Sequence, residues 1–232
     1  MRRSIYTANL IVITATLLFC CSAGYASAPA VHVGGDFRRM SVEDCTSKAI
    51  DTMMDQQHFI YAEANGSYAW GYNENSIAIV HGVPMNDGVY IFVAAFSTDS
   101  AEAERLRNTI REYVFNGPSI GRRAPRSGVY RTNDANRRAT SLGFEWDGFN
   151  KPATADLFRS CAQSAMERNG LQYSASGKQI IFGIGKTATV VALGVSLPST
   201  TQVLVIAVSA DSNEATRLKH EVHSSISGCS SL

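Results

Sequence analysis

A fifteen-residue stretch occurs twice in this 232-residue chain, and the duplication restricts the folds the chain can adopt. The first copy is Ser97–Arg111 (STDSAEAERLRNTIR), and the second, 112 positions later, is Ser209–His223 (SADSNEATRLKHEVH). Seven of the first ten positions are identical. The duplication predicts that the chain consists of two copies of one structural unit. It leaves the function open.

Each copy of the stretch is predicted to begin a helix after a strand. Asp99 and Asp211 stand at the expected N-caps, where a carboxylate accepts a free backbone N–H of the first turn. Glu102 and Glu214 follow three residues later, which is the capping-box spacing. Paired catalytic carboxylates or a cation site are the alternative. Helix capping accounts for both the spacing and the position, so we favour it.

The two units have the same predicted order of elements. A helix comes first, then three or four strands joined by short turns, then a second helix. Such turns indicate antiparallel pairing, and a helix at each end places both helices on one face of the sheet. The fold class is therefore α+β, with two tandem helix–antiparallel sheet–helix repeats packed as a pseudo-symmetric pair. The repeats are expected at residues 38–116 and 151–232, with residues 29–37 as an irregular lead-in.

The N-terminus has the pattern of a secretory signal peptide over residues 1–26. Arg2 and Arg3 precede the short apolar run Leu10–Cys21, and small residues around Ala26 form a cleavage site. We therefore expect a periplasmic or secreted protein. Lipid attachment at Cys20 or Cys21, or a retained membrane anchor, are the alternatives.

Three cysteines remain after this cleavage, and export allows a disulfide. Cys45 and Cys161 fall on the apolar faces of the first helices and are taken as equivalent. Their separation of 116 implies four extra residues in the first unit, near Met53–Gln57. Cys229 lies just beyond the last helix. If the two helices of the second unit pack side by side, Cys161 and Cys229 form the bridge and Cys45 stays a buried thiol.

Residues 117–150 are predicted to be a linker rich in arginine, with a short extra strand near Trp146. Guanidinium groups suit phosphate and carboxylate, so the segment could contact an anionic lipid, a polyanion or an acidic partner. A solvated linker is the simpler interpretation. The candidate anion contacts are Arg122, Arg123, Arg126, Arg137 and Arg138.

Three short motifs resemble functional sites but lack the required context. Ser119 lies in a Gly-x-Ser-x-Gly pattern, yet a helix precedes it where a nucleophile elbow needs a strand. Gly185–Thr187 resembles the end of a phosphate-binding loop, but it lies between two strands and reads as a hairpin turn. His220 and His223 share a helix without an obvious third metal ligand. No cofactor or metal is expected.

Three aromatic side chains alternate along one predicted strand: Tyr68, Trp70 and Tyr72. Because they are two residues apart, they lie on the same face of the sheet. Burial under the helices or against the other unit is expected, and an exposed ligand-binding face is the alternative. His81, on the next strand, is interpreted as a core or edge histidine.

The function expected from these features is that of a non-enzymatic protein of the bacterial cell envelope. It would bind a protein, peptide or small ligand through the sheet or the groove between the units. The layout loosely resembles that of small exported envelope domains, a likeness of topology only. A hydrolase or metal-dependent enzyme using Ser119 or the histidine pair, and contact with an anionic membrane surface through the linker, are the alternatives. The net charge of +1 gives no reason to expect nucleic-acid binding.

Overall fold

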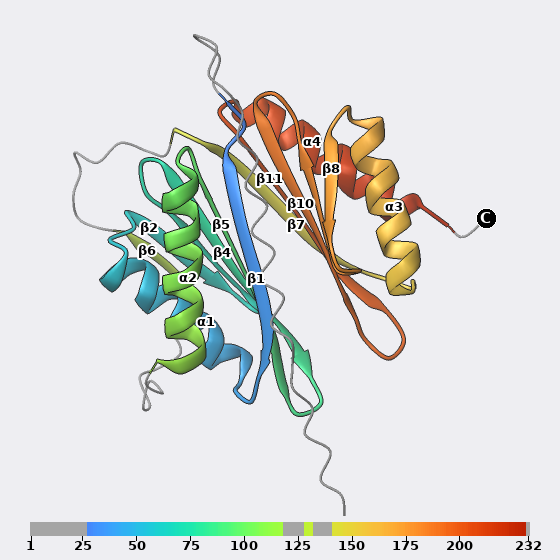
Figure 1. Ribbon diagram of the computed structural model, residues 1–232. Coiled ribbons are helices and arrows are strands. Elements are labelled where there is room, and N and C mark those ends of the chain that lie inside the picture. Colours follow the sequence, from blue (N-terminus) through green and yellow to red (C-terminus); the bar gives the residue numbers. More distant parts are fainter. Residues whose placement is uncertain (1–26, 118–127, 132–140, 231–232) are drawn as a thin grey trace, which may run out of the picture.

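The computed structural model describes residues 27–117, 128–131 and 141–230, and it confirms the pseudo-symmetric pair of helix–sheet units. Each unit contains a strand, a helix, four more strands and a closing helix (Figure 1). None of the helices in these ranges is long and apolar enough to span a bilayer.

The first unit has an antiparallel sheet with the strand order β1-β5-β4-β3-β2-β6. The last strand, β6, comes from the segment between the units and pairs with β2. The elements are β1 (Ala30–Arg38), α1 (Val42–Asp51), the π-helical turn η1 (Thr52–Gln56), β2 (Tyr61–Asn65), β3 (Tyr68–Tyr72), β4 (Ser76–Met85), β5 (Gly88–Ser97), α2 (Ser100–Asn116) and β6 (Gly128–Arg131).

The second unit repeats this order in the sheet β7-β11-β10-β9-β8. Its closing strand and helix lie 112 residues after their counterparts, as the duplicated stretch predicts. The elements are β7 (Gly143–Lys151), α3 (Ala155–Arg168), β8 (Gln172–Ser176), β9 (Ile180–Ile184), β10 (Ala188–Ser196), β11 (Thr201–Ser209) and α4 (Ser212–Gly228).

The sequence did not predict the first strand of the first unit, and it predicted only part of the first strand of the second. Residues 30–38, expected to be an irregular lead-in, form β1 and pair with β5 along their whole length. Its counterpart β7 occupies the end of the expected linker and pairs with β11. Unit boundaries at 38 and 151 therefore leave out a strand of each unit. Two consecutive glycines, Gly34 and Gly35, lower the strand propensity of β1. For this reason the strand was not predicted from the sequence.

The two sheets pack face to face, and the helices cover their outer faces (Figure 1). One apolar cluster fills the space between the sheets, with side chains such as Phe92 and Phe96 of β5 and Leu204 of β11. Separate clusters lie between each sheet and its own helices. Because the central strands are buried on both faces, they read as continuous apolar runs instead of alternating ones. The space considered as an inter-unit groove is thus a packed layer.

The aromatic face of β3 belongs to this layer between the sheets, as expected for burial against the other unit. The Tyr68 ring lies 4.4 Å from Trp146 of β7, and the Trp70 ring lies 5.7 Å from Phe144. Ring contacts of this kind add to the free energy gained by burying the apolar area. The three aromatic residues therefore hold the two units together.

The helix N-caps confirm the capping interpretation. Asp99 Oδ1 accepts hydrogen bonds from the N–H groups of Ala101 and Glu102, and Asp211 Oδ1 accepts one from Asn213. The carboxylates predicted to complete the capping boxes point elsewhere, as described below.

The first helices correct the expected alignment of the repeats. The α1 N-cap, Ser41, matches the α3 N-cap, Thr154, at an offset of 113, and each side chain accepts from the backbone N–H three residues on. After the first helix, equivalent residues of the two units are again 112 positions apart. The first helix of the first unit therefore contains one extra residue and not four. The π-helical turn Thr52–Gln56 accommodates it, because a π turn is a one-residue insertion in an α-helix.

This alignment makes Phe158, and not Cys161, the counterpart of Cys45. Both side chains pack over a strand glycine. A Cβ added to Gly82 would lie 3.4 Å from Cys45 Sγ, and one added to Gly194 would lie 2.5 Å from the Phe158 ring. Cys45 is a buried free thiol, and burial raises its pKa to about 12.

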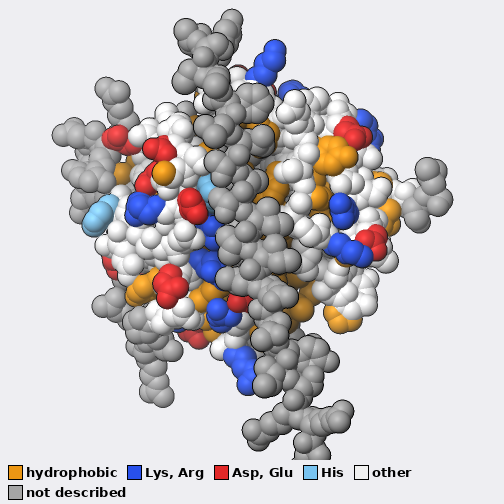
Figure 2. Space-filling model, in the orientation of Figure 1, with side chains coloured by type: hydrophobic (Ala, Val, Ile, Leu, Met, Phe, Trp, Pro, Cys, Tyr) orange, Lys and Arg blue, Asp and Glu red, His pale blue; other side chains and the backbone are white. Residues whose placement is uncertain are grey.

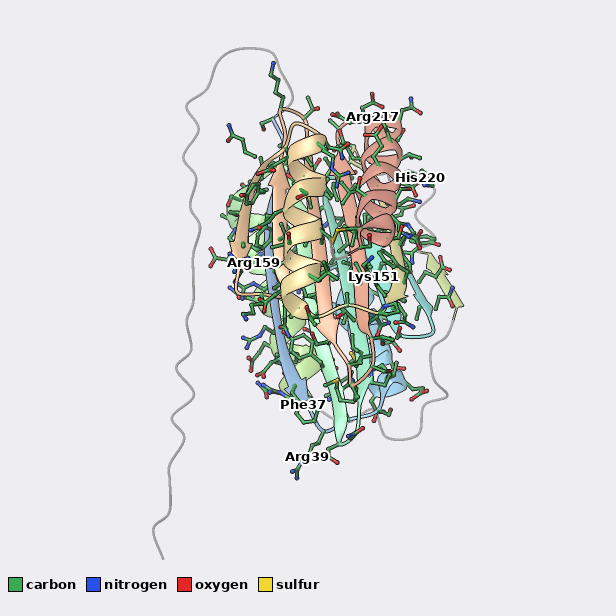
Figure 3. The ribbon with its side chains drawn as sticks, turned by 90° about the vertical axis from the view of Figure 1, so that its right-hand side faces the viewer. Phe37, Arg39, Lys151, Arg159, Arg217 and His220 are labelled. Atoms are coloured by element: carbon green, nitrogen blue, oxygen red, sulfur yellow. A yellow bond between two sulfur atoms is a disulfide. The ribbon has the colours of Figure 1, made fainter. Side chains whose placement is uncertain are left out.

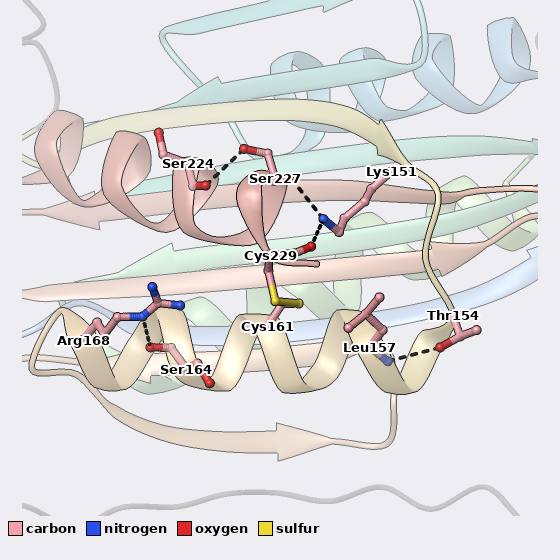
Figure 4. The surroundings of a disulfide bond; sticks show 9 residues. All are labelled: Lys151, Thr154, Leu157, Cys161, Ser164, Arg168, Ser224, Ser227 and Cys229. Atoms are coloured by element: carbon pink, nitrogen blue, oxygen red, sulfur yellow. Dashed lines mark hydrogen bonds between the residues drawn. A yellow bond between two sulfur atoms is a disulfide. The ribbon is translucent and has the colours of Figure 1, made fainter. Parts of the chain in front are cut away.

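Cys161 and Cys229 form a disulfide, the pair expected from side-by-side packing of the helices (Figure 4). The bond joins the middle of α3 to the residue that follows α4. Lys151 Nζ reaches the same helix end and donates to the carbonyl oxygens of Ser227 and Cys229. The end of α4 is therefore held both covalently and by a buried ammonium group.

Candidate functional site

A polar cavity of about 720 Å³ opens at one end of the first unit. It lies where the turn between β3 and β4, the end of β5 and the first turn of α2 meet. Its walls carry hydroxyl, amide, carboxylate and imidazole groups. The lining residues are His58, Ile60, Asn73, Glu74, Asn75, Ser76, Ser97, Thr98, Asp99 and Glu102.

Two buried serines form the inner wall of the cavity. Ser76 and Ser97 are each about 1% exposed, and their hydroxyl oxygens lie 3.0 Å apart. The Ser97 hydroxyl also donates to the carbonyl of Asn75 at 3.1 Å and accepts from the Asp99 N–H at 3.2 Å. Hydrogen bonding to each other and to the backbone occupies these hydroxyls. The arrangement suits the wall of a binding site better than a nucleophile with its base.

A carboxylate reaches the same place in the second unit. Glu214 folds inward, where its Oε2 accepts from the hydroxyls of Thr187 and Ser209, the latter at 3.0 Å. The serine itself is common to both units, because Ser209 bonds to the Thr187 carbonyl and to the Asp211 N–H as Ser97 does to its neighbours. The counterpart of Thr187 in the first unit is Asn75. The first unit therefore lacks the threonine hydroxyl that donates to the carboxylate in the second.

Glu102, the counterpart of Glu214, turns away from the serines. Arg105 donates two hydrogen bonds to it, from Nε at 2.7 Å and from Nη2 at 2.8 Å. Gln57 accepts a third hydrogen bond from the same guanidinium and fixes its position. This fork geometry favours the outward position of the carboxylate.

A different partner leaves Glu214 free to fold inward in the second unit. Arg217, the counterpart of Arg105, donates to Glu221 one turn further along α4, at 2.6 Å. The position of Glu221 is Thr109 in the first unit, which offers no charge. The differences at positions 75 and 109 together account for the two directions of the carboxylate.

His58 stands at the rim of the cavity in an unusual backbone conformation. It has a φ of +52° and is the single non-glycine residue with positive φ among the described residues. Its counterpart after α3 is Gly170, with a φ of +67°. Glycine adopts this conformation without steric cost, whereas a histidine at such a position is strained and is a common feature of functional sites. His58 lies three residues before the start of β2.

The sequence motifs that resembled catalytic or metal sites lie in different parts of the chain. Ser119 and the candidate anion contacts Arg122, Arg123, Arg126, Arg137 and Arg138 lie outside the described residues. The Gly185–Thr187 segment is the turn between β9 and β10, as predicted.

The histidine pair on α4 is divided between two environments. His220 lies on the outer side of α4 (Figure 3), whereas His223 Nδ1 lies 2.9 Å from Asp147 Oδ2 and its ring stacks on Phe149. Among the residues of the described ranges, no three His, Cys, Asp or Glu side chains gather as a metal site would require.

The sequence did not indicate Ser76 and Ser97 as site residues, and helix capping was favoured for Glu102 over a catalytic or cation-binding role. A signal was present in the comparison of the repeats. Ser76 replaces Ala188, and Thr109 replaces Glu221, within stretches that otherwise align.

Comparisons with known proteins find loosely similar solved structures, among them two di-domain proteins. One is the di-domain ARO/CYC StfQ from the steffimycin biosynthetic pathway, with a TM-score of 0.27 and 6% identity over 85% of this chain and 97% of that one. The other is the di-domain ARO/CYC BexL from the BE-7585A biosynthetic pathway, with a TM-score of 0.26 and 6% identity over 87% and 99%. Superpositions this loose do not bear on function. No protein-family model and no curated protein matches the chain.

Proposed function

We propose that this protein is an exported, non-enzymatic binding protein that holds a small polar ligand in the cavity of its first unit. The observation that carries the proposal is the contrast between the units. The same scaffold turns Glu214 inward onto two hydroxyls in one copy, whereas the other copy turns Glu102 outward and has a cavity of about 720 Å³. A volume of this size accommodates a small molecule.

The lining favours a ligand rich in hydrogen-bond donors. The lining includes the carboxylate residues Glu74, Asp99 and Glu102 and the amide residues Asn73 and Asn75. These groups accept hydrogen bonds, and the carboxylates also attract positive charge. We therefore expect a hydroxylated or amino-bearing compound, such as a sugar, an amino sugar or a polyamine.

A variant that closes the cavity tests the proposal. The double substitution Asn75→Thr with Thr109→Glu reproduces the second unit. Glu at position 109 gives Arg105 an alternative partner, and Thr at position 75 offers Glu102 a hydroxyl. We expect native mass spectrometry and calorimetry with a panel of sugars, amino sugars and polyamines to detect a ligand for the wild type, and binding to be lost in the double variant.

A matched control distinguishes closure from a general loss of structure. The control variant, Thr109→Gln with Asn75→Thr, has side chains of the same size as the closed variant but no charge at position 109. Arg105 should therefore keep its hydrogen bonds to Glu102, and ligand binding should persist. Equal ligand binding by the wild type and the closed variant would contradict the proposal, and so would the absence of any bound compound from the panel.

Export is supported by the N-terminal sequence pattern and is a separate part of the proposal. Residues 1–26 lie outside the described residues. Cell fractionation followed by N-terminal sequencing tests it. A mature N-terminus at Ser27 is expected, and an uncleaved cytoplasmic chain would refute it.

A further inference from the structure

The outer face of the first unit carries basic side chains where β1 runs beside α2. On α2, Arg107 and Arg111 are one turn apart and face the strand at Gly34. A Cβ built on Gly34 would lie 3.5 Å from Arg107 Cδ and 3.6 Å from Arg111 Cδ. Figure 2 shows Lys and Arg side chains gathered along the line between these two elements. The strand therefore presents bare backbone to the side chains of two arginines.

The second unit has a carboxylate at the equivalent point. Gly34 of β1 corresponds to Asp147 of β7, and Arg111 of α2 corresponds to His223 of α4. Asp147 Oδ2 lies 2.9 Å from His223 Nδ1, so strand and helix meet there in an ion pair when the histidine is protonated. Replacing the aspartate by glycine removes this partner from the first unit.

Neither arginine forms an ion pair with a described residue. Arg107 Nε is buried and has no hydrogen-bond acceptor. The guanidinium of Arg111 lies over the Phe115 ring at 4.9 Å and shows no hydrogen bond to a described residue. Burial and the nearby charge of Arg111 both lower the pKa of Arg107. Buried N–H donors are nearly always paired in folded proteins, so an unpaired one here indicates an acceptor that comes from outside.

The neighbouring charged residues do not form ion pairs with Arg107 or Arg111. Glu104 is the acidic residue that acts on Arg107, and no ion pair joins the two. Asp36 already accepts from Arg38 at 2.8 Å, and His32 bonds to the Ser100 hydroxyl at 3.2 Å. The positive charge beside Gly34 is thus without an ion-pair partner among the described residues.

We infer that Arg107 and Arg111 bind the carboxylate or phosphate group of a small molecule above Gly34. The oxyanion takes the place that the side chain of Asp147 holds in the second unit. Arginine suits this task because its planar fork donates two parallel hydrogen bonds to such a group. The site shares no lining residue with the cavity of the first unit, so either can exist without the other.

Titration with inorganic phosphate and with acetate tests the inference, using thermal unfolding and calorimetry against chloride at equal ionic strength. Both anions should stabilise the wild-type protein more than chloride does. Gly34→Asp supplies an internal carboxylate and should weaken phosphate binding by about tenfold or more, as should Arg111→Gln. The ordinary van der Waals contacts around a Cβ at this position allow the substitution.

Two controls separate charge from shape. Gly34→Asn has nearly the same size as Gly34→Asp without the charge and should keep most of the affinity. His223→Gln changes the counterpart in the second unit and should bind phosphate as the wild type does.

Three results would overturn the inference. They are a phosphate effect no larger than that of chloride, an equal loss in Gly34→Asn and Gly34→Asp, and binding to phosphatidylglycerol vesicles without binding to phosphate or acetate. The last of these would assign the two arginines to a membrane surface.

Discussion

Lys48 in the first unit occupies the position that Cys161 holds in the second, seven residues after the N-cap of its helix. Lys48 Nζ donates to the carbonyl of Gly117 at 2.7 Å, and Cys161 is bonded to Cys229. Gly117 and Cys229 are the C-caps of the two closing helices. Each unit therefore ties the middle of its first helix to the end of its last one, by a hydrogen bond in one copy and by a covalent bond in the other.

Removing the disulfide should destabilise the protein considerably. The bond closes a chain segment with a sequence separation of 68. The chain-entropy model gives about 4 kcal/mol for a loop of this length. We expect Cys161→Ser with Cys229→Ser to lower the free energy of unfolding in urea by an amount of this order. Thiol counting on the denatured chain without residues 1–26 should find one reactive group, Cys45, and three would refute the bridge.

Lys48→Met should weaken the first unit alone. The Lys48 side chain is 5% exposed, and its charged hydrogen bond to Gly117 is partly buried. Losing a hydrogen bond to a charged group costs about 1.5–3 kcal/mol, less whatever the methionine gains by packing. Lys186→Met, at an exposed turn, is the control and should leave the unfolding midpoint almost unchanged. Equal effects of the two substitutions would show that the Lys48 contact does not contribute to stability.

Two glycine substitutions should differ because of the side chains beneath them. In Gly194→Ala the new Cβ would lie 2.5 Å from the Phe158 ring, which is part of the core. In Gly82→Ala the closest atom is Val89 Cγ1 at 3.0 Å. Overpacking a core costs about 1–3 kcal/mol, so Gly194→Ala should approach the upper value and Gly82→Ala the lower one. Phe158→Leu should partly rescue Gly194→Ala, and unfolding curves that rank the two alanine variants in reverse would contradict the packing argument.

His81 should make the protein less stable in acid. Burial lowers its pKa to about 3 from 6.5, so between these values the unfolded chain binds a proton that the folded one does not. The full contribution to stability is present above pH 6.5 and declines as the pH falls toward 3, by about 5 kcal/mol at most.

Replacing His81 by its counterpart tests this pH dependence. In the second unit the equivalent residue is Leu193, so His81→Leu should flatten the decline in unfolding free energy between pH 6.5 and 4. His32, whose pKa burial also lowers, supplies part of the slope, so His32→Gln should flatten it less. An unchanged slope in His81→Leu would show that the neutral buried imidazole is not its source.

The sequence predicted those parts of the fold that depend on local chemistry. The duplicated stretch predicted the two closing helices and their aspartate caps. Turn residues in the sequence marked where one strand ends and the next begins. The disulfide followed from the expected packing of two helices. These features succeed because a cap or a hairpin is determined by residues near it in the chain.

The remaining features depend on contacts distant in sequence. β1 contains Gly34 and Gly35, and it is a strand because it pairs with β5 and not because of its own composition. The alignment of the first helices failed because cysteines were matched to each other, whereas the glycines beneath them pair Cys45 with Phe158. The cavity was missed because the direction of Glu102 depends on a threonine at position 109 one turn away.

The apolar layer shared by the two sheets bears on how such a chain could arise. A single unit would expose that entire sheet face to water, so a half-length ancestor would have needed a second copy of itself as a partner. In a symmetric assembly every residue change occurs on both sides at once. Joining the copies in one polypeptide removed that constraint, so that Asp147 could persist in one half while glycine stood at position 34 of the other.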